Sequence, residues 1–395
     1  MSAPMAQFTE ALDVLCRKVA ADETAIGTQF PYVTLADGSW DLMPVSHSAG
    51  YREGKNWDHG NWFCGFWVGL LVAAYLHSRD EKFLRLAEDR MVLVTERADD
   101  GNTHDIGFIF ISSALPLYRV TGNARWRGVG IRAADRLRSR LVVTRSGSYI
   151  SSWGPMSDPR GRASSAIDTM ANIPLLYWAA KETGDASYAL AAEAHARMTD
   201  KSFTRSDQTL YHAVEYDTAS GNRLRGYTFQ GQSDESSWSR GTGWDVYGLA
   251  ATAAATGDAS YLRRAETVAM KWLSQLGDAV VPPWDFDDRS ADATRDSAAS
   301  AIMAAALLDV ADLQAEDTRR QRWLDEATRL LEGLCAHFLA RDDVHRGLLR
   351  HACYSRPHGV GEDSAVMFGD YFFVEALMRV VSPNSFIESK RAPQF

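Results

Sequence analysis

Thr183-Gly184-Asp185-Ala186-Ser187-Tyr188 is the stretch that decides the fold, because the same residue types return as Thr256-Gly257-Asp258-Ala259-Ser260-Tyr261. Each copy is a short turn with an acidic residue, followed by an aromatic residue and a polar amphipathic segment. Looser copies of this unit are Arg79-Asp80-Glu81-Lys82-Phe83, Thr121-Gly122-Asn123-Ala124-Arg125-Trp126 and a segment from Asp317 that includes Trp323. Repeated units of one turn and one helix are typical of an array of helical hairpins.

Two kinds of helix are expected to alternate around these turns. Segments that are apolar nearly all round predict buried helices, at about 62–77, 105–120, 165–182, 237–255, 294–313 and 364–381. Segments with one apolar face predict an outer layer, at about 6–21, 80–98, 124–141, 186–200, 259–275 and 318–341. Six inner helices alternating with six outer ones predict an all-α fold, the (α/α)6 barrel. No Pro- or Gly-rich linker divides the chain, so residues 1–395 are expected to form one catalytic domain.

The long connections predict where the functional face lies. They span about 21–61, 141–164, 200–236 and 275–293, and each leads into an inner helix. They should therefore gather at one end of the barrel, and long loops on a rigid scaffold are where binding and chemistry usually occur. Residues 209–216 and 223–229, which flank a turn at 218–222, predict a β-hairpin in this loop layer.

The charge and the apolar runs exclude some kinds of partner. The 395-residue chain has a net charge of -9, and no cluster of Lys or Arg forms a stripe that could follow a nucleic acid backbone. No run approaches the roughly 18 uncharged apolar residues that cross a bilayer. Residues 1–20 lack the pattern of a secretory signal, so a cytoplasmic protein without membrane contact is expected. Both a monomer and a homodimer are compatible with the sequence.

The cysteines and histidines do not predict a metal site or a cofactor. Cys16, Cys64, Cys335 and Cys353 are scattered without paired spacing, and the ten histidines contain no pair spaced for one helix face. We therefore expect neither a metal nor a cofactor.

Two aspartates are the strongest candidates for chemistry. Asp105 and Asp168 lie in the expected first turns of the second and third inner helices, each among apolar residues. Either carboxylate could simply cap its helix, a contribution of about 0.3–1 kcal/mol. As a pair they suit acid/base chemistry, because desolvation raises the pKa of one carboxyl while a better-solvated partner stays ionised. Tryptophans near helix starts suit stacking on sugar rings; these are Trp57, Trp62, Trp153, Trp238 and Trp244.

Two basic residues leave alternatives open. His104 could donate to a ligand or act as a helix cap. Arg240 lies between two tryptophans and two glycines, where a buried guanidinium needs an anionic partner. That partner could be an internal aspartate or a substrate carboxylate. Asp296, Asp370 and Tyr371 are expected to form structural pairs.

The combined motifs resemble glycoside hydrolase family 88, the unsaturated glucuronyl hydrolases. The resemblance rests on motifs in order from about residue 60 to 380: Trp62-Phe63-Cys64-Gly65-Phe66-Trp67, His104-Asp105-Ile106-Gly107-Phe108, Ile167-Asp168 with Asn172-Ile173-Pro174-Leu175-Leu176, Gln230-Gly231, Ser237-Trp238-Ser239-Arg240-Gly241, Pro283-Trp284-Asp285-Phe286-Asp287, Arg295-Asp296-Ser297 and Gly369-Asp370-Tyr371-Phe372. It implies an (α/α)6 barrel that acts on oligosaccharides made by polysaccharide lyases. The terminal sugar of such a substrate is a 4-deoxy uronic acid with a C4=C5 double bond, which is protonated at C4 and hydrated at C5.

The resemblance also implies roles for individual residues. Asp168 would be the general acid and base, and Asp105 the carboxylate that orients the substrate. The uronate would be contacted by His104, His212, Gln230 and Arg240. The pocket would be walled by Trp62, Phe66, Trp153, Trp238 and Trp244.

Two departures from the family pattern concern the sugar that leaves. Phe229 stands where better-known members have His, and Thr242-Gly243 stands where Gln-Ala is common. Three other functions are alternatives: an unsaturated rhamnogalacturonyl hydrolase acting on pectin fragments, a sugar 2-epimerase on the same barrel, and a non-catalytic sugar-binding protein. The His-Asp-Ile-Gly-Phe run favours the glucuronyl family. An epimerase would need histidine bases on the inner helices, and a binding protein would not need two desolvated carboxylates.

Overall fold

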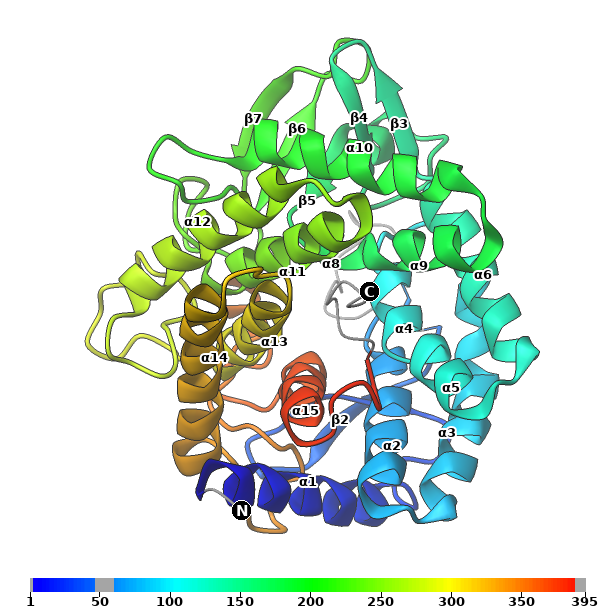
Figure 1. The fold of residues 1–395 in the computed structure, drawn as a ribbon, viewed down its shortest axis with the longest axis vertical. Helices are drawn as coiled ribbons and strands as arrows, with labels where there is room; N and C mark the ends of the chain where they lie inside the picture. The colour runs from blue at the N-terminus through cyan, green and yellow to red at the C-terminus, as the bar shows by residue number, and fades with distance from the viewer. Residues whose placement is uncertain (1–2, 47–59, 388–395) are drawn as a thin grey trace.

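The computed structural model describes residues 3–46 and 60–387, and its helices form a ring of two layers (Figure 1). The inner layer consists of α2 (Cys64–Ser78), α4 (Ile106–Ile111) with α5 (Ala114–Thr121), α8 (Thr169–Asn172) with α9 (Pro174–Thr183), α11 (Ser239–Thr256), α13 (Ser297–Asp312) and α15 (Met367–Val381). The outer layer consists of α1 (Ala3–Asp22), α3 (Glu81–Val94) with the 3-10 turn η1 (Thr95–Asp99), α6 (Ala124–Arg138), α10 (Ala186–Phe203), α12 (Ala259–Leu276) and α14 (Asp317–His337). Two short helices, α7 (Pro159–Ala163) and η2 (Arg356–His358), lie in connections. The predicted (α/α)6 barrel is confirmed.

The repeated turn both ends an inner helix and starts an outer one. Gly184 and Gly257 close α9 and α11 in the left-handed conformation, with φ of 75° and 71°, which glycine adopts without steric cost. The side chains of Asp185 and Asp258 then accept the N–H two residues later, at 2.9 and 2.8 Å. Asp80 and Asn123 cap α3 and α6 in the same way. The turn therefore reverses the chain and separates each inner helix from the next outer helix.

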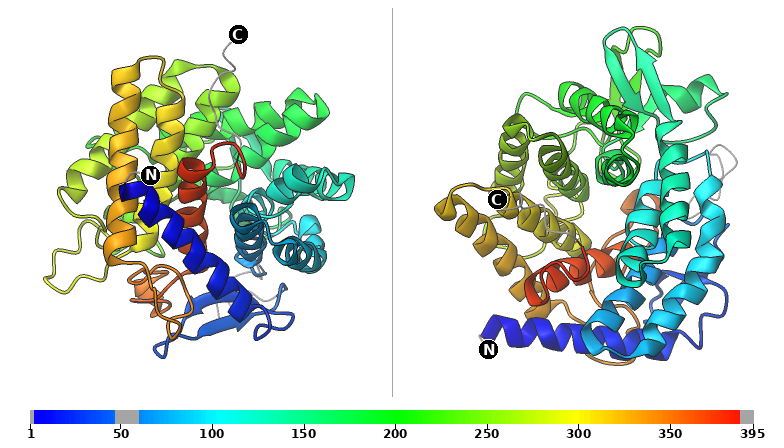
Figure 2. Two further views of the ribbon diagram at one scale, coloured as in Figure 1. Left: turned by 60° about the horizontal axis from the view of Figure 1, so that its bottom comes forward. Right: turned by 45° about the vertical axis from the view of Figure 1, so that its right-hand side comes forward.

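The ring is closed by contact between the two ends of the chain. Helix α1 packs against α2, α14 and α15, so the first outer helix contacts the last inner one. Figure 2 shows α15 (red) enclosed in the ring, with α1 (blue) on its outer side. In the described ranges, no helix has the length and apolar run that crossing a membrane would need.

The second and third inner helices are interrupted, although the sequence predicted continuous helices at 105–120 and 165–182. Pro174 begins α9 and has no N–H to donate into α8, so the third helix breaks there. In the second helix, the hydroxyl of Ser112 donates to the carbonyl of Phe108 and that of Ser113 to Ile109. Such bonds compete with the helix ladder and bend or interrupt it.

The loop layer contains more strand than the sequence predicted. The expected hairpin is present as β6 (Ala213–Tyr216) and β7 (Arg223–Tyr227), and β5 (Ser164–Ala166) pairs antiparallel with β6. The third inner helix therefore starts at residue 169 rather than 165. Two further antiparallel hairpins are formed by β1 (Phe30–Thr34) with β2 (Trp40–Met43), and by β3 (Leu141–Thr144) with β4 (Gly147–Ile150). Strand β1 is buried at every position, so it lacks the alternation that reveals a strand in a sequence.

The starts of the second and third inner helices approach very closely. A Cβ atom added to Gly107 in α4 would lie 2.5 Å from the Cβ of Asn172 in α8. The Asn172 side chain accepts a hydrogen bond from the backbone N–H of Phe108 at 2.5 Å and donates one to the carbonyl of Asp168 at 2.9 Å. Glycine at 107 thus lets one amide join the two helix starts that carry Asp105 and Asp168.

We expect Gly107→Ala to lower the free energy of unfolding by about 1–3 kcal/mol, because the new methyl group would push α4 away from α8. The matched control is Gly128→Ala in α6, where an added Cβ meets no atom within 4 Å. This control should gain about 0.4–1 kcal/mol by restricting the unfolded chain. Urea unfolding of both variants measures the difference. Equal or higher stability of Gly107→Ala would show that the close approach is not needed.

Candidate active site

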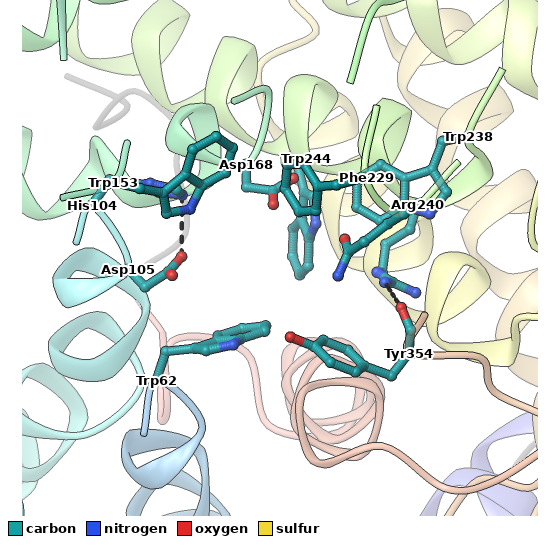
Figure 3. A pocket seen from close by; sticks show the side chains of 11 residues that line it. Trp62, His104, Asp105, Trp153, Asp168, Phe229, Trp238, Arg240, Trp244 and Tyr354 are labelled. Atoms are coloured by element: carbon teal, nitrogen blue, oxygen red, sulfur yellow. Dashed lines mark hydrogen bonds and ion pairs between the residues drawn. The ribbon is translucent and has the colours of Figure 1, made fainter. Parts of the chain in front are cut away.

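A pocket opens among the long connections, at the starts of the inner helices. It is lined by Trp62, His104, Asp105, Trp153, Asp168, Phe229, Gln230, Trp238, Arg240, Trp244 and Tyr354. Figure 3 shows Asp105 and Asp168 on one side of this space, with Arg240 and Tyr354 facing them. The pocket therefore brings residues from widely separated parts of the chain to one end of the barrel.

Asp168 stands just before α8 but does not cap it. Its backbone is already helical, with φ of -58° and ψ of -25°, and its side chain accepts no cap hydrogen bond. One carboxyl oxygen, Oδ1, is buried and has no hydrogen-bond partner among the described residues. Burial raises the pKa of Asp168 to about 7, a rise that the charge of His104 opposes and that of Asp105 increases. Asp168 can therefore hold a proton near neutral pH.

Asp105 is in a different environment, although it too stands just before a helix that it does not cap. The Thr103 hydroxyl donates to Oδ2 at 3.0 Å, and His104 Nε2 lies 3.1 Å from Oδ1. The side chain thus has a polar group beside each oxygen, which favours the charged form. Neither aspartate caps its helix. Their surroundings differ: those of Asp168 favour a carboxyl that keeps its proton, and those of Asp105 favour a carboxylate.

Arg240 has its anionic partner inside the protein. Its Nη1 lies 2.6 Å from Asp296 Oδ2, and both side chains are buried. The guanidinium also donates to the backbone carbonyls of Cys353 and Tyr354, the latter at 2.6 Å. It lies over the ring of Trp238, 4.7 Å from the ring centroid. The internal ion pair, one of the two alternatives for Arg240, is therefore present, and the charge on the pocket wall is largely compensated.

Aromatic rings form most of the remaining wall. Trp62 stacks on Phe368 with a centroid distance of 5.4 Å and an interplanar angle of 15°. Trp153 meets Phe229 edge-on at 4.8 Å, and Trp244 contacts Phe372 at 5.0 Å. The four tryptophans predicted for the pocket all line it: Trp62, Trp153, Trp238 and Trp244. Trp57, which was also expected near a helix start, lies outside the described residues. Rings held in this way offer flat apolar surfaces to a sugar.

Two residues predicted for the pocket lie one layer behind it. Phe66 is in the body of α2, where the helix turns its side chain into the core, and it packs against Trp62 and Tyr371. His212 lies behind Trp238 and Phe229, at centroid distances of 4.2 and 4.0 Å. Burial lowers the pKa of His212 well below its usual value, so the ring is neutral. Neither side chain lines the pocket, and each can only support the residues that do.

Tyr354 lines the pocket but was not predicted from the sequence. It precedes α15 in a connection that carries no family motif, and its backbone carbonyl accepts from Arg240. Burial raises the pKa of its phenol to about 12, so the hydroxyl stays protonated. Phe229 was noticed only as a departure from the family pattern. The sequence indicated Tyr354 only indirectly. A buried Arg240 needs hydrogen-bond acceptors, but the sequence does not show that one of them is the carbonyl of Tyr354.

A helical barrel with paired carboxylates among tryptophans at its loop-covered end defines a carbohydrate-active enzyme. The sequence profile of Glycosyl Hydrolase Family 88 matches residues 40–371. The chain therefore belongs to glycoside hydrolase family 88. Across the described residues, no group of three or more His, Cys, Asp or Glu side chains could hold a metal ion.

Individual relatives are similar over nearly their whole length. The unsaturated glucuronyl hydrolase of Bacillus sp. (strain GL1) is 35% identical over 82% of this chain and 87% of its own. The unsaturated chondroitin disaccharide hydrolase of Streptococcus pneumoniae is 30% identical over 94% of this chain and 91% of its own. The crystal structure of the Bacillus enzyme matches with a TM-score of 0.88 at 32% identity, covering 98% of this chain and 100% of that one.

We expect Asp168→Asn to stabilise the protein at high pH. A carboxyl whose folded pKa of about 7 lies above its unfolded value binds its proton more tightly when folded, so stability falls as pH rises between about 4 and 7. Asparagine is neutral throughout and avoids this loss, a gain on the order of 2 kcal/mol at about pH 8. Urea unfolding of both proteins at about pH 5 and about pH 8 gives the difference. Asp105→Asn is the control and should show no such gain; a gain that did not depend on pH would contradict the explanation.

Proposed function

We propose that this protein releases the terminal 4,5-unsaturated uronic acid from oligosaccharides that polysaccharide lyases produce. The observation that carries the proposal is the pocket-facing carboxyl of Asp168, whose pKa of about 7 lets it deliver a proton near neutral pH. Family membership supports the same reaction. A structure of the unsaturated glucuronyl hydrolase of Streptococcus agalactiae holds dGlcA-GalNAc6S, and its TM-score is 0.79 at 25% identity.

The reaction needs proton delivery and water activation. The carboxylic acid of Asp168 gives its proton to C4, and the electrons of the C4=C5 bond form the new C–H bond. Positive charge develops at C5 and is shared by the ring oxygen. The Asp168 carboxylate then accepts a proton from water as the water oxygen bonds to C5. The resulting hemiketal opens to a ketone, and the anomeric carbon releases the rest of the saccharide as an alcohol.

The other pocket residues would bind and orient this substrate. Asp105 would orient the sugar and keep negative charge near the developing cation. Gln230 would donate to the uronate. His104, whose two ring nitrogens face Ser152 and Asp105, would act on the substrate through Asp105. Arg240 is already paired with Asp296, so its positive charge in the pocket would be partly balanced. The aromatic wall would stack against the sugar faces. His212 and Phe66 would act through the rings in front of them.

The described residues of one chain form the pocket. We propose that residues 1–395 act as one catalytic domain, because closure of the ring needs helices from both ends of the chain. One protomer is then sufficient for catalysis, whether the protein is a monomer or a homodimer. We place its activity in the cytoplasm, where imported lyase products would reach it.

Incubation with an unsaturated uronyl disaccharide should remove the ultraviolet absorbance of the conjugated double bond. We expect Asp168→Asn to lower kcat by at least about 10²-fold, since it removes the general acid. The matched control is Asp245→Asn, because Asp245 is also buried with a pKa raised to about 7 but does not line the pocket. The kcat of this control should stay within about twofold of that of the unaltered enzyme, because Asp245→Asn leaves the general acid in place.

A panel of substrates separates the alternatives. Loss of absorbance with unsaturated rhamnogalacturonyl fragments alone would favour the pectin enzyme. Isomerisation of saturated sugars would favour the epimerase, and binding without turnover would favour a sugar-binding protein. No reaction with any unsaturated uronyl disaccharide would overturn the proposal.

The pH dependence of the reaction should follow the proton on Asp168. Since the acid form is the one that protonates C4, kcat/KM should fall as pH rises through about 7. The fall should approach about tenfold per pH unit once the acid is mostly ionised. Initial rates across the pH range measure this limb, and Asp245→Asn should show the same limb. A rate that held constant well above neutral pH would mean that another group is the acid.

A further inference from the structure

His104 has one ring nitrogen whose proton is fixed by its surroundings. Nδ1 lies 3.0 Å from the backbone carbonyl of Ser152, and the His104 backbone N–H donates to the same oxygen at 2.9 Å. A carbonyl oxygen can only accept, so Nδ1 must carry a hydrogen. Because His104 is buried, the ring has little freedom to exchange this partner for water.

The other ring nitrogen faces a carboxylate. Nε2 lies 3.1 Å from Asp105 Oδ1, the pair marked by a dashed line in Figure 3. The contact is an ion pair by distance and not an aligned hydrogen bond. An unprotonated nitrogen and a carboxylate oxygen would repel each other at this distance, so one of the two must carry a proton. That proton belongs either to an imidazolium or to a protonated Asp105.

The neighbouring threonine and the ordinary proton affinities of the two groups together favour the imidazolium. The backbone N–H of Asp105 donates to Thr103 Oγ1 at 3.0 Å, which leaves the hydroxyl hydrogen of Thr103 to donate to Asp105 Oδ2, also at 3.0 Å. Asp105 Oδ2 is therefore an acceptor, which leaves only Oδ1 as a place for a proton on this carboxyl. An isolated imidazole also binds a proton far more tightly than an isolated carboxylate does, with ordinary pKa values of about 6.5 and 3.9.

We propose that His104 is an imidazolium in the free protein and acts as the positioning residue that decides which aspartate carries the catalytic proton. The positive charge of His104 keeps Asp105 ionised. The proton that the two carboxylates could otherwise share is therefore bound by Asp168. This role rests on the proposed function, in which Asp168 is the acid. Without a cation beside them, two carboxylates in one pocket would hold a single proton jointly.

The other charged and titratable groups around His104 are compatible with this charge. Burial lowers the pKa of His104, but the charges of Asp105 and Asp168 outweigh this effect, and the pKa lies above its ordinary value. The nearby Arg140 donates to backbone carbonyls at 101, 151 and 154 and not to either aspartate. His195 accepts from the N–H of Ile150, and burial lowers its pKa to about 3, so it is neutral. Burial keeps His212 neutral as well.

Ser152 also connects this arrangement to the second aspartate. Its hydroxyl lies 3.1 Å from Thr169 Oγ1, at the residue that follows Asp168, and it accepts from the N–H of Ala166 at 2.7 Å. The residue whose carbonyl fixes the proton on His104 is therefore bonded to the start of α8 as well. The proton on His104 Nδ1 and the position of Asp168 therefore both depend on Ser152.

The charge on His104 can be measured without any substrate. Nitrogen NMR of the ¹⁵N-histidine-labelled protein distinguishes an imidazolium, with both ring nitrogens protonated, from a neutral ring. His104→Gln assigns the signal, and His104→Asn serves if the first variant does not fold. We expect both nitrogens to stay protonated at least one pH unit above about 6.5. A neutral ring with a bare Nε2 at about pH 7 would overturn the proposal and would leave the proposed function untouched.

The pH profile tests the effect of that charge on catalysis. In His104→Gln, loss of the cation should raise the pKa of Asp168, so the fall of kcat/KM at high pH should move up by about one pH unit. His77→Gln is the control, because His77 pairs with Asp13 away from the pocket and should leave the profile in place. A His104→Gln profile that lost height without moving would show a merely structural role and would also overturn the proposal.

Discussion

The side chain of Asn172 joins the two helix starts on which the whole site is built. It accepts from the N–H of Phe108 and donates to the carbonyl of Asp168, across an approach that Gly107 makes possible. These bonds fix the distance between the aspartates before any substrate arrives, and preorganised geometry is worth more to catalysis than contacts made later. The interruption at Pro174 is part of this arrangement, because it leaves α8 as a short segment that can be oriented by one amide.

The barrel could be predicted because its determinants are local. A glycine in the left-handed conformation and an aspartate or asparagine cap lie next to each other in the sequence, and together they end one helix and start the next. The interruptions at Ser112 and Pro174 and the short strands could not be placed in the same way. They depend on serine hydroxyls that compete with the helix ladder and on strands whose burial gives no alternating pattern.

The sequence predicted most of the residues that line the pocket, but it did not distinguish them from residues one layer behind. Residues at helix starts, such as Asp105 and Trp62, reach the pocket because the connections converge there. Phe66 is four residues beyond Trp62 in the same motif, yet the helix carries it into the core, so sharing a motif did not mean sharing the pocket. Tyr354 shows the opposite case: it enters from a connection whose path is set by the buried Arg240 and Asp296, which lie far from it in the sequence.

The contact between α1 and α15 has a consequence for how the protein is made. Helix α1 leaves the ribosome before the other helices of the ring, whereas α15, one of the surfaces that it covers, is synthesised after them. All the helices of the ring must therefore be synthesised before it can close. Contacts between residues so far apart in the sequence slow folding, and apolar surface stays exposed until they form. The pocket contains residues from Trp62 to Tyr354, so it is complete only after synthesis has passed Tyr354. Activity should consequently appear late in synthesis and all at once, rather than growing with each helical pair.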